Sequence, residues 1–272
     1  MTATAIRTPP GSARRLGFLG VLRSEFLKLR SVPSTFWTLA LTVVFNVVFA
    51  ALAATFVAGR LSAADRQKVD GIRLALAGLH LSQVAIGVLG VLVMTSEYGT
   101  GMIRVTFAAV PRRRVVLAAK AMVFAATALV VGTVSSFAAY FVFQTLLSGS
   151  GTGLKSSLGD PGVLRAVTGG GLYLAVLGLL GLGLGTVIRA GAGAIATLFG
   201  LLFAPALLLD LLPHSWQSTV GPYLPMQAGS QIFVAVSGEP DSLGTWTGFG
   251  VFCLYAVAAV TVGFVLLDRR DA

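Results

Sequence analysis

Residues 167–188 read VTGGGLYLAVLGLLGLGLGTVI, a run of 22 residues without a charged side chain. An α-helix rises about 1.5 Å per residue, so a run of about 20 apolar residues crosses the hydrocarbon core of a bilayer. Five further runs of this kind lie at 36–57, 75–95, 121–143, 192–212 and 246–267. The sequence therefore predicts an all-α polytopic membrane protein with six transmembrane helices.

The composition agrees with this prediction and excludes several classes of protein. Of the 272 residues, 56% are hydrophobic and 11% charged, whereas soluble domains carry about 25% charged residues. The net charge of +10 is spread between the apolar runs, so no continuous basic footprint for a nucleic acid is expected. Cys253 is the only cysteine, and the two histidines lie far apart, so we expect neither a metal site nor a cofactor bound by this chain.

The distribution of basic residues predicts the orientation. If the N-terminus lies inside, fourteen of the twenty lysines and arginines fall on the cytoplasmic side and six on the outer side. Because cytoplasmic segments of membrane proteins are enriched in these residues, both termini are predicted to be cytoplasmic. The chain then divides into an N-terminal segment (1–35), a six-span permease-like domain (36–267) and a short tail (268–272). The first span is longer than the apolar core of a signal peptide and is expected to be retained.

An amphipathic helix is predicted before the first span. Apolar residues recur there at spacings of three and four, while the charged residues lie largely off that line: Leu16, Leu19, Leu22, Phe26 and Leu29. Such a helix suits the headgroup layer of the inner leaflet, so membrane lipid is an expected partner.

Glycines form a face on the fourth span. Gly171, Gly178 and Gly185 repeat every seven residues, and Gly181 with Gly185 forms a G-x-x-x-G motif. Small residues let two helices approach closely in a membrane. The pattern predicts either helix packing inside one chain or an interface between two copies.

Polar residues within the spans are candidates for a substrate pathway. They are Asn46, His80, Gln83, Ser136 and Tyr140. We expect either a weakly polar cavity that opens outward or ordinary hydrogen bonds between helices. Asp210, near the outer end of the fifth span, is either a solvated interfacial carboxylate or a site for a cationic substrate. The outer loop 213–245 either forms short broken helices in the membrane or packs as an outer cap.

The segment 96–120 carries the most informative pattern, SEYGTGMIR at 96–104 followed by PRRRVVLAAK at 111–120. Thr100 is a suitable cap for a short helix from Gly101 towards Ala109, and Pro111 cannot continue that helix. The arginines at 112–114 either hold the inner ends of the spans or contact a partner, and Lys120 is expected to anchor its span by extending to the headgroups.

This segment resembles the type 2 family of ABC-transporter permeases, in which the second span ends in a Glu-x-Gly-Thr pattern and leads through Pro-x-x-Arg to an Ala-Lys start of the third span. The topology of the whole chain resembles the same family. Gly101 departs from the family's pattern, because it adds flexibility where a stiffer helix start is expected.

The resemblance implies a membrane subunit that exports an amphiphilic or hydrophobic compound from a bacterial cell across the plasma membrane. Its implied partners are an ABC-type ATPase subunit, which binds ATP and Mg, and a second copy or a related permease. The implied contacts with the ATPase are residues of the 96–120 loop: Glu97, Gly99, Thr100, Arg104, Pro111 and Arg112.

Other functions remain open on the sequence alone. An ion-driven secondary transporter usually carries charges and broken helices at the membrane midplane, whereas His80 and Asp210 lie off-centre. A membrane anchor or sensory subunit would need no transport cycle. The chain has no Walker A motif and no local cluster of catalytic residues, so we do not expect it to be an enzyme itself.

Overall fold

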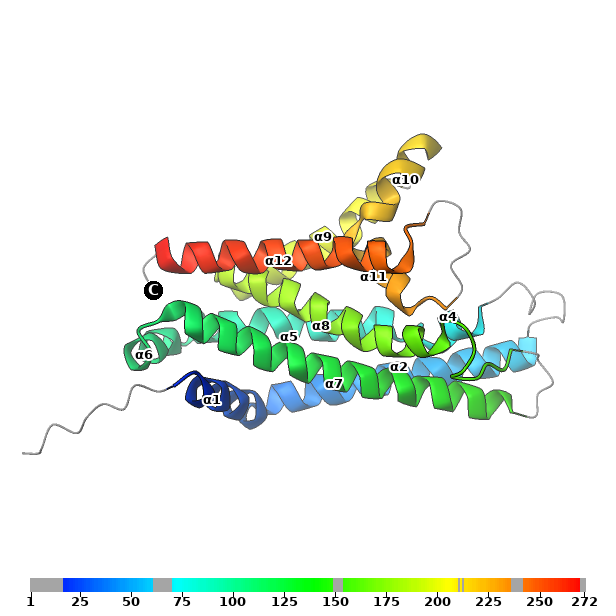
Figure 1. Ribbon diagram of the computed structural model, residues 1–272, viewed down its shortest axis with the longest axis horizontal. Helices are drawn as coiled ribbons and strands as arrows, with labels where there is room; N and C mark the ends of the chain where they lie inside the picture. Colours follow the sequence, from blue (N-terminus) through cyan, green and yellow to red (C-terminus); the bar gives the residue numbers. More distant parts are fainter. Residues whose placement is uncertain are drawn as a thin grey trace, which may run out of the picture.

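The structure is a computed structural model that describes residues 17–60, 70–148, 154–209, 211, 213–235 and 242–269. All regular structure within these residues is helical (Figure 1). Six helices are long and apolar enough to cross a membrane: α2 (Pro33–Arg60), α5 (Leu79–Gly99), α7 (Arg113–Leu147), α8 (Val163–Ile188), α9 (Gly191–Leu209) and α12 (Thr245–Arg269). The predicted all-α, six-span architecture is confirmed.

Seven shorter elements connect or precede the spans. They are α1 (Phe18–Ser31), α4 (Gly71–Ala75), α6 (Met102–Ala109), α10 (His214–Val220), η1 (Gly221–Tyr223), α11 (Pro225–Ser230) and η2 (Gln231–Phe233). In Figure 1, α1, α6 and the end of α12 lie at one end of the bundle, and α4 and α11 lie towards the other. We call the first of these the α6 end. The segment between α9 and α12 contains the short helices α10, η1, α11 and η2. α11 packs against α12, and η2 packs against α8 and α12.

α8 forms the centre of the bundle. It contacts α5, α7, α9 and α12 and is the most buried of the six long helices. The glycines predicted as a packing face lie inside the chain, where a Cβ on Gly178 would meet the Phe124 ring and one on Gly171 would meet Thr133. Gly181 and Gly185 lie against the backbone of α5. All four therefore contact α5 or α7 of the same chain.

The closest backbone approach joins α5 to α8. A Cβ added to Gly90 would lie 2.3 Å from the carbonyl oxygen of Gly178, and one added to Gly181 would lie 2.5 Å from the carbonyl oxygen of Gly87. Helices in lipid gain no hydrophobic driving force from each other, so this contact relies on close van der Waals packing.

The start of α5 differs from the prediction that the second span begins at residue 75. Asp70 caps the separate helix α4 by accepting hydrogen bonds from the backbone N–H groups of Ile72 and Arg73. α5 begins at Leu79. The preceding residue, Gly78, packs against the backbone of Asn46 in α2. The third span is longer than expected, because α7 extends towards the α6 end beyond the apolar run.

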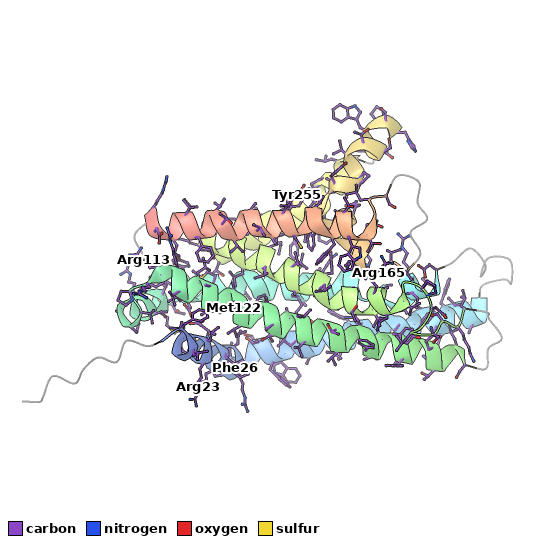
Figure 2. All side chains as sticks on the ribbon, viewed as in Figure 1. Arg23, Phe26, Arg113, Met122, Arg165 and Tyr255 are labelled. Carbon is purple, nitrogen blue, oxygen red and sulfur yellow. The ribbon has the colours of Figure 1, made fainter. Side chains whose placement is uncertain are left out.

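α1 is a separate helix, as predicted, and part of its apolar line faces away from the bundle. Leu19 is 79% exposed and Phe26 50% exposed, while Val21 and Glu25 are buried. Figure 2 shows Phe26 and Arg23 pointing away from the other helices. α1 therefore presents apolar side chains outward and a charged residue inward.

We expect Gly90→Ala to destabilise the protein because its methyl group would displace the backbone of α8, a kind of overpacking that costs about 1 to 3 kcal/mol. Gly250→Ala in α12 is the matched control, since no atom lies within 4 Å of an added Cβ there. The measurement is the melting temperature of the purified protein in detergent. Equal melting temperatures for the two variants would contradict the close packing of α5 on α8.

Candidate functional site

The connection between α5 and α6 depends on Gly101. Its φ of 71° lies in the left-handed region, which glycine adopts without strain. The Gly101 N–H donates to the carbonyl of Tyr98, so the chain leaves α5 in a tight turn and enters α6 directly. Gly101 thus determines the sharp change of direction here.

The predicted cap at Thr100 is wrong. The Thr100 hydroxyl donates to the carbonyl of Ser96, one turn back in α5, and Gly101 is the residue before α6. Helix α6 does end before Pro111, as expected, and α7 begins at Arg113. The short helix therefore exists, but backbone geometry at Gly101 rather than a side-chain cap starts it.

α6 presents one face to solvent and one to the protein. Ile103 is 2% exposed, whereas Val105 is 69% exposed and Met102 44%. Of the sequence-predicted coupling residues, those with exposed positions are Gly99, Thr100, Arg104, Pro111 and Arg112. Glu97 is different, because it is only 3% exposed and cannot form part of an outer contact surface in this conformation.

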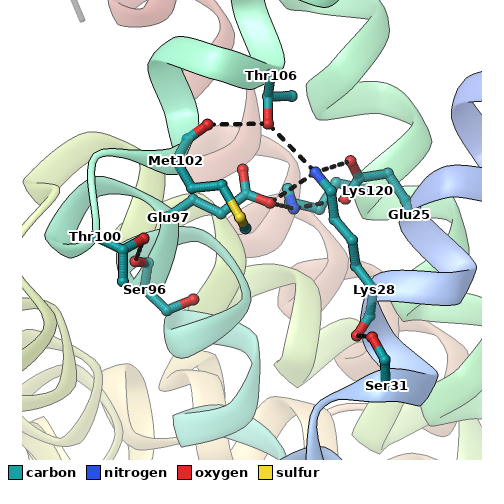
Figure 3. Close-up of polar contacts among 9 residues, drawn as sticks. All are labelled: Glu25, Lys28, Ser31, Ser96, Glu97, Thr100, Met102, Thr106 and Lys120. Carbon is teal, nitrogen blue, oxygen red and sulfur yellow. Dashed lines mark hydrogen bonds and ion pairs between the residues drawn. The ribbon is translucent and has the colours of Figure 1, made fainter.

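Glu97 belongs to a group of four charges, three of them buried and Lys28 partly exposed, which we call the ion cluster: Glu25, Lys28, Glu97 and Lys120 (Figure 3). Lys120 Nζ lies 2.6 Å from Glu25 Oε2 and 2.9 Å from Glu97 Oε1. Lys28 Nζ lies 2.8 Å from Glu25 Oε1 and 2.9 Å from Glu97 Oε1. Two carboxylates and two ammonium groups give a formal charge of zero.

The ion cluster joins four elements at the α6 end. Glu25 and Lys28 come from α1, Glu97 from the last turn of α5 and Lys120 from α7. Lys28 also donates to the hydroxyl of Thr106 in α6, at 3.4 Å. Each carboxylate accepts hydrogen bonds from both lysines, so the cluster holds α1, α5 and α7 together. α6 packs beside it through Thr106.

Because three charged groups of the cluster are buried, each of them needs a partner of opposite charge. Glu25, Glu97 and Lys120 are each 3% exposed, and an isolated charge at such a position would be strongly disfavoured. For Lys28, burial alone would lower the pKa, but hydrogen bonds and charge interactions with Glu25 and Glu97 outweigh it and raise the pKa above 10.5. Lys28 therefore stays protonated at neutral pH.

The prediction that Lys120 reaches the headgroups as a membrane anchor is wrong, because its ammonium group is buried between Glu25 and Glu97. Two signals in the sequence pointed to the cluster. Glu25 and Lys28 are three residues apart on a mostly apolar helix, and opposite charges lie at the adjoining ends of the second and third spans. Sequence spacing alone does not show that these pairs meet.

The arginines beside α6 connect it to other helix ends. Arg113 lies over the ring of Phe107, at 5.3 Å from its centroid, and donates to the carbonyl of Leu267. Arg114 pairs with Asp268 at 2.5 Å. Figure 2 labels Arg113 at the end of α12. Two of the three consecutive arginines thus bind the end of α12, while the Arg112 side chain stays exposed.

Two of the predicted substrate-pathway residues form hydrogen bonds deep in the bundle. Asn46 is fully buried and donates to Ser82 and Ser135. Gln83 accepts from the Tyr173 hydroxyl, deep in the bundle. These contacts are hydrogen bonds between helices, one of the two alternatives given by the sequence, but Asn46 Oδ1 is buried without a hydrogen-bond partner in the described part of the chain.

The other pathway candidates make contacts of their own. Tyr140 donates to the carbonyl of Ser156 at 2.6 Å. Ser136 is buried against Gly170, and His80 is exposed with its ring 5.8 Å from that of Phe233. Asp210 lies outside the described residues.

A cavity of about 170 Å³ adjoins the ion cluster. Its charged side is formed by all four cluster residues, and its other walls come from α1, the start of α2, α5 and α6. No group of three or more potential metal ligands occurs within the part of the chain that the structure describes. Comparisons with protein-family models and with curated protein sequences found no match to this chain.

We expect Lys120→Met to lower the free energy of unfolding by about 3 to 5 kcal/mol, because it leaves two buried carboxylates with one cation. Arg114→Met is the matched control: it removes an ion pair whose arginine side chain is 71% exposed, worth about 0 to 1 kcal/mol. Thermal unfolding in detergent measures both. A control that melts at or below the temperature of Lys120→Met would refute the structural role of the cluster.

Proposed function

We propose that this protein is the membrane-spanning permease subunit of an ATP-binding-cassette exporter in a bacterial plasma membrane. The observation that carries the proposal is α6, a short helix between the second and third spans with an exposed face and a buried ionic base. The sequence resemblance of residues 96–120 to type 2 permeases supports the same function. ATP hydrolysis would occur on a separate ATPase subunit, and the cargo would be an amphiphilic or hydrophobic compound.

The geometry suits a docking element. Met102, Arg104 and Val105 offer apolar and cationic contacts on the exposed side of α6, and Arg112 adds a second cation nearby. Interface hot spots commonly combine apolar anchors with arginine. A partner bound to this face would displace α6. α6 is connected to α1 because the Thr106 hydroxyl accepts a hydrogen bond from Lys28.

The ion cluster would transmit a displacement of α6 to the transmembrane helices. A displacement of α6 would act on α1 through Lys28 and on α5 and α7 through Glu97 and Lys120. Rigid elements that share fixed polar contacts move together more readily than loops do. In this scheme a second copy or a related permease completes the transporter, and α6 carries the movement of the ATPase to the spans.

The first test is purification of the full chain together with an ABC-type ATPase encoded beside it. We expect Val105→Asp to weaken the association about tenfold or more, because a carboxylate would replace an apolar anchor at the interface. Arg104→Ala should weaken it as well. Lys155→Ala, an exposed lysine outside the α6 end, is the control and should have no effect.

Both α6 variants leave the ion cluster intact, so they should melt at the wild-type temperature. Undiminished ATPase association in Val105→Asp and Arg104→Ala would remove α6 from the proposed role. Full transport activity in the absence of any ATPase would exclude the exporter function itself.

A further inference from the structure

The cavity beside the ion cluster has two chemically different sides. Glu97 and Lys28 belong to its polar side. Its apolar walls are formed by Leu29, Val32, Leu89, Leu92, Val93 and Met102. Its lining residues include side chains of α1, α5 and α7, so it lies where α1 meets the ends of the spans. With α1 in the headgroup layer, as the sequence predicts, this is the depth at which an amphiphile places its head and the first part of its chain. An apolar cavity of about 150 Å³ accommodates a benzene ring, so about 170 Å³ suffices for a small head and the adjoining methylene groups.

One carboxylate oxygen of the ion cluster accepts no hydrogen bond from the described residues. The Lys28 ammonium uses its three N–H groups on Glu25, Glu97 and Thr106. Both oxygens of Glu25 accept from a lysine, but Glu97 accepts both of its bonds on Oε1. Glu97 Oε2 is buried and has no hydrogen-bond partner. A buried carboxylate oxygen without a donor is unfavourable, so this atom needs a donor from outside the cluster.

The balance of charge decides which donor fits. An anionic head would face a carboxylate and a Lys28 whose donors are already used. A cationic head would add a third positive charge to a group that is already neutral and only partly hydrated. A hydroxyl donates a hydrogen bond to Glu97 Oε2 without changing the charge.

Met102 and Glu97 both line the cavity, and Figure 3 draws the Met102 side chain in front of the Glu97 carboxylate. Methionine has a flexible, unbranched side chain that adapts to what it packs against. Because Glu97 Oε2 is buried, a ligand in the cavity reaches it only when a lining side chain such as Met102 moves aside.

We propose that this cavity binds an uncharged amphiphile through a hydroxyl head that donates to Glu97 Oε2, with its apolar chain along α5 and the start of α2. The site needs neither ATP nor an ATPase partner. Its occupancy can therefore be tested independently of the export function.

The test uses the full-length protein in nanodiscs of zwitterionic lipid, with ¹³C-labelled methionine methyl groups. The probe is 1-octanol, and octylammonium and octanoate provide the same chain with a charged head. We expect 1-octanol to shift the Met102 resonance saturably, and the charged probes to bind at least about tenfold more weakly. Met122 lines a different, apolar cavity and reports nonspecific partitioning.

Leu92→Trp should fill the cavity without touching the cluster and weaken 1-octanol binding about tenfold or more. The matched control is Leu254→Trp in α12, where leucine is 67% exposed and lies outside the cavity. If Leu92→Trp melts below Leu254→Trp, Ser96→Trp blocks the same cavity from an exposed position.

Three results would overturn the proposal. They are a Met102 resonance that does not saturate, an equal response at Met122, and undiminished binding in a cavity-filling variant that is folded. Binding of octylammonium or octanoate as tight as that of 1-octanol would overturn the assignment of an uncharged head.

Discussion

The mutual neutralisation of Glu25, Glu97 and Lys120 is the constraint on which the α6 end of this protein depends. Each of these side chains is almost completely buried, and none could remain there charged without the others. Lys28 completes the balance of charge and extends the network to Thr106. The residues that meet come from four elements, so the cluster fixes where α1 lies on the spans and how α6 projects from them.

Packing around α8 supplies the scaffold for this arrangement. Gly90 and Gly178 bring the backbones of α5 and α8 into contact, and Gly171 brings α8 close to α7. α5 and α7 are the two spans that carry Glu97 and Lys120. The glycine contacts thus set the relative positions of these helices along the bundle, and the ion cluster depends on those positions at one end.

The long elements could be predicted from the sequence because a membrane span has one strong signal, the length of its apolar run. The fourth span ends at Ile188 both in the prediction and in α8. The predicted start of the second span is wrong because the chain forms two helices there: α4, which Asp70 caps, and α5, which begins after Gly78. Hydropathy does not record such local effects.

The site was harder to predict. The sequence predicts a short helix within the 96–120 segment, but the inward position of Glu97 and Lys120 depends on a network of contacts that includes Glu25, far away in the sequence. The candidates Asn46 and Gln83 form hydrogen bonds between helices, and the Oδ1 atom of Asn46 is buried without a hydrogen-bond partner in the described part of the chain. A polar residue within a span usually has a hydrogen-bond partner. The sequence does not show whether that partner is a ligand or another helix.

The central claim is that the ion cluster holds α6 and α1 as one rigid unit. The most direct test measures the distance distribution between spin labels at Val105 and Leu19 in lipid, with Cys253 replaced by alanine, because both labelled side chains are strongly exposed. The account predicts one narrow distribution, which broadens in Lys28→Met and stays narrow in Arg23→Met, a change at an exposed position of α1. A distribution that is already broad without these substitutions, or that is unaffected by Lys28→Met, would contradict it.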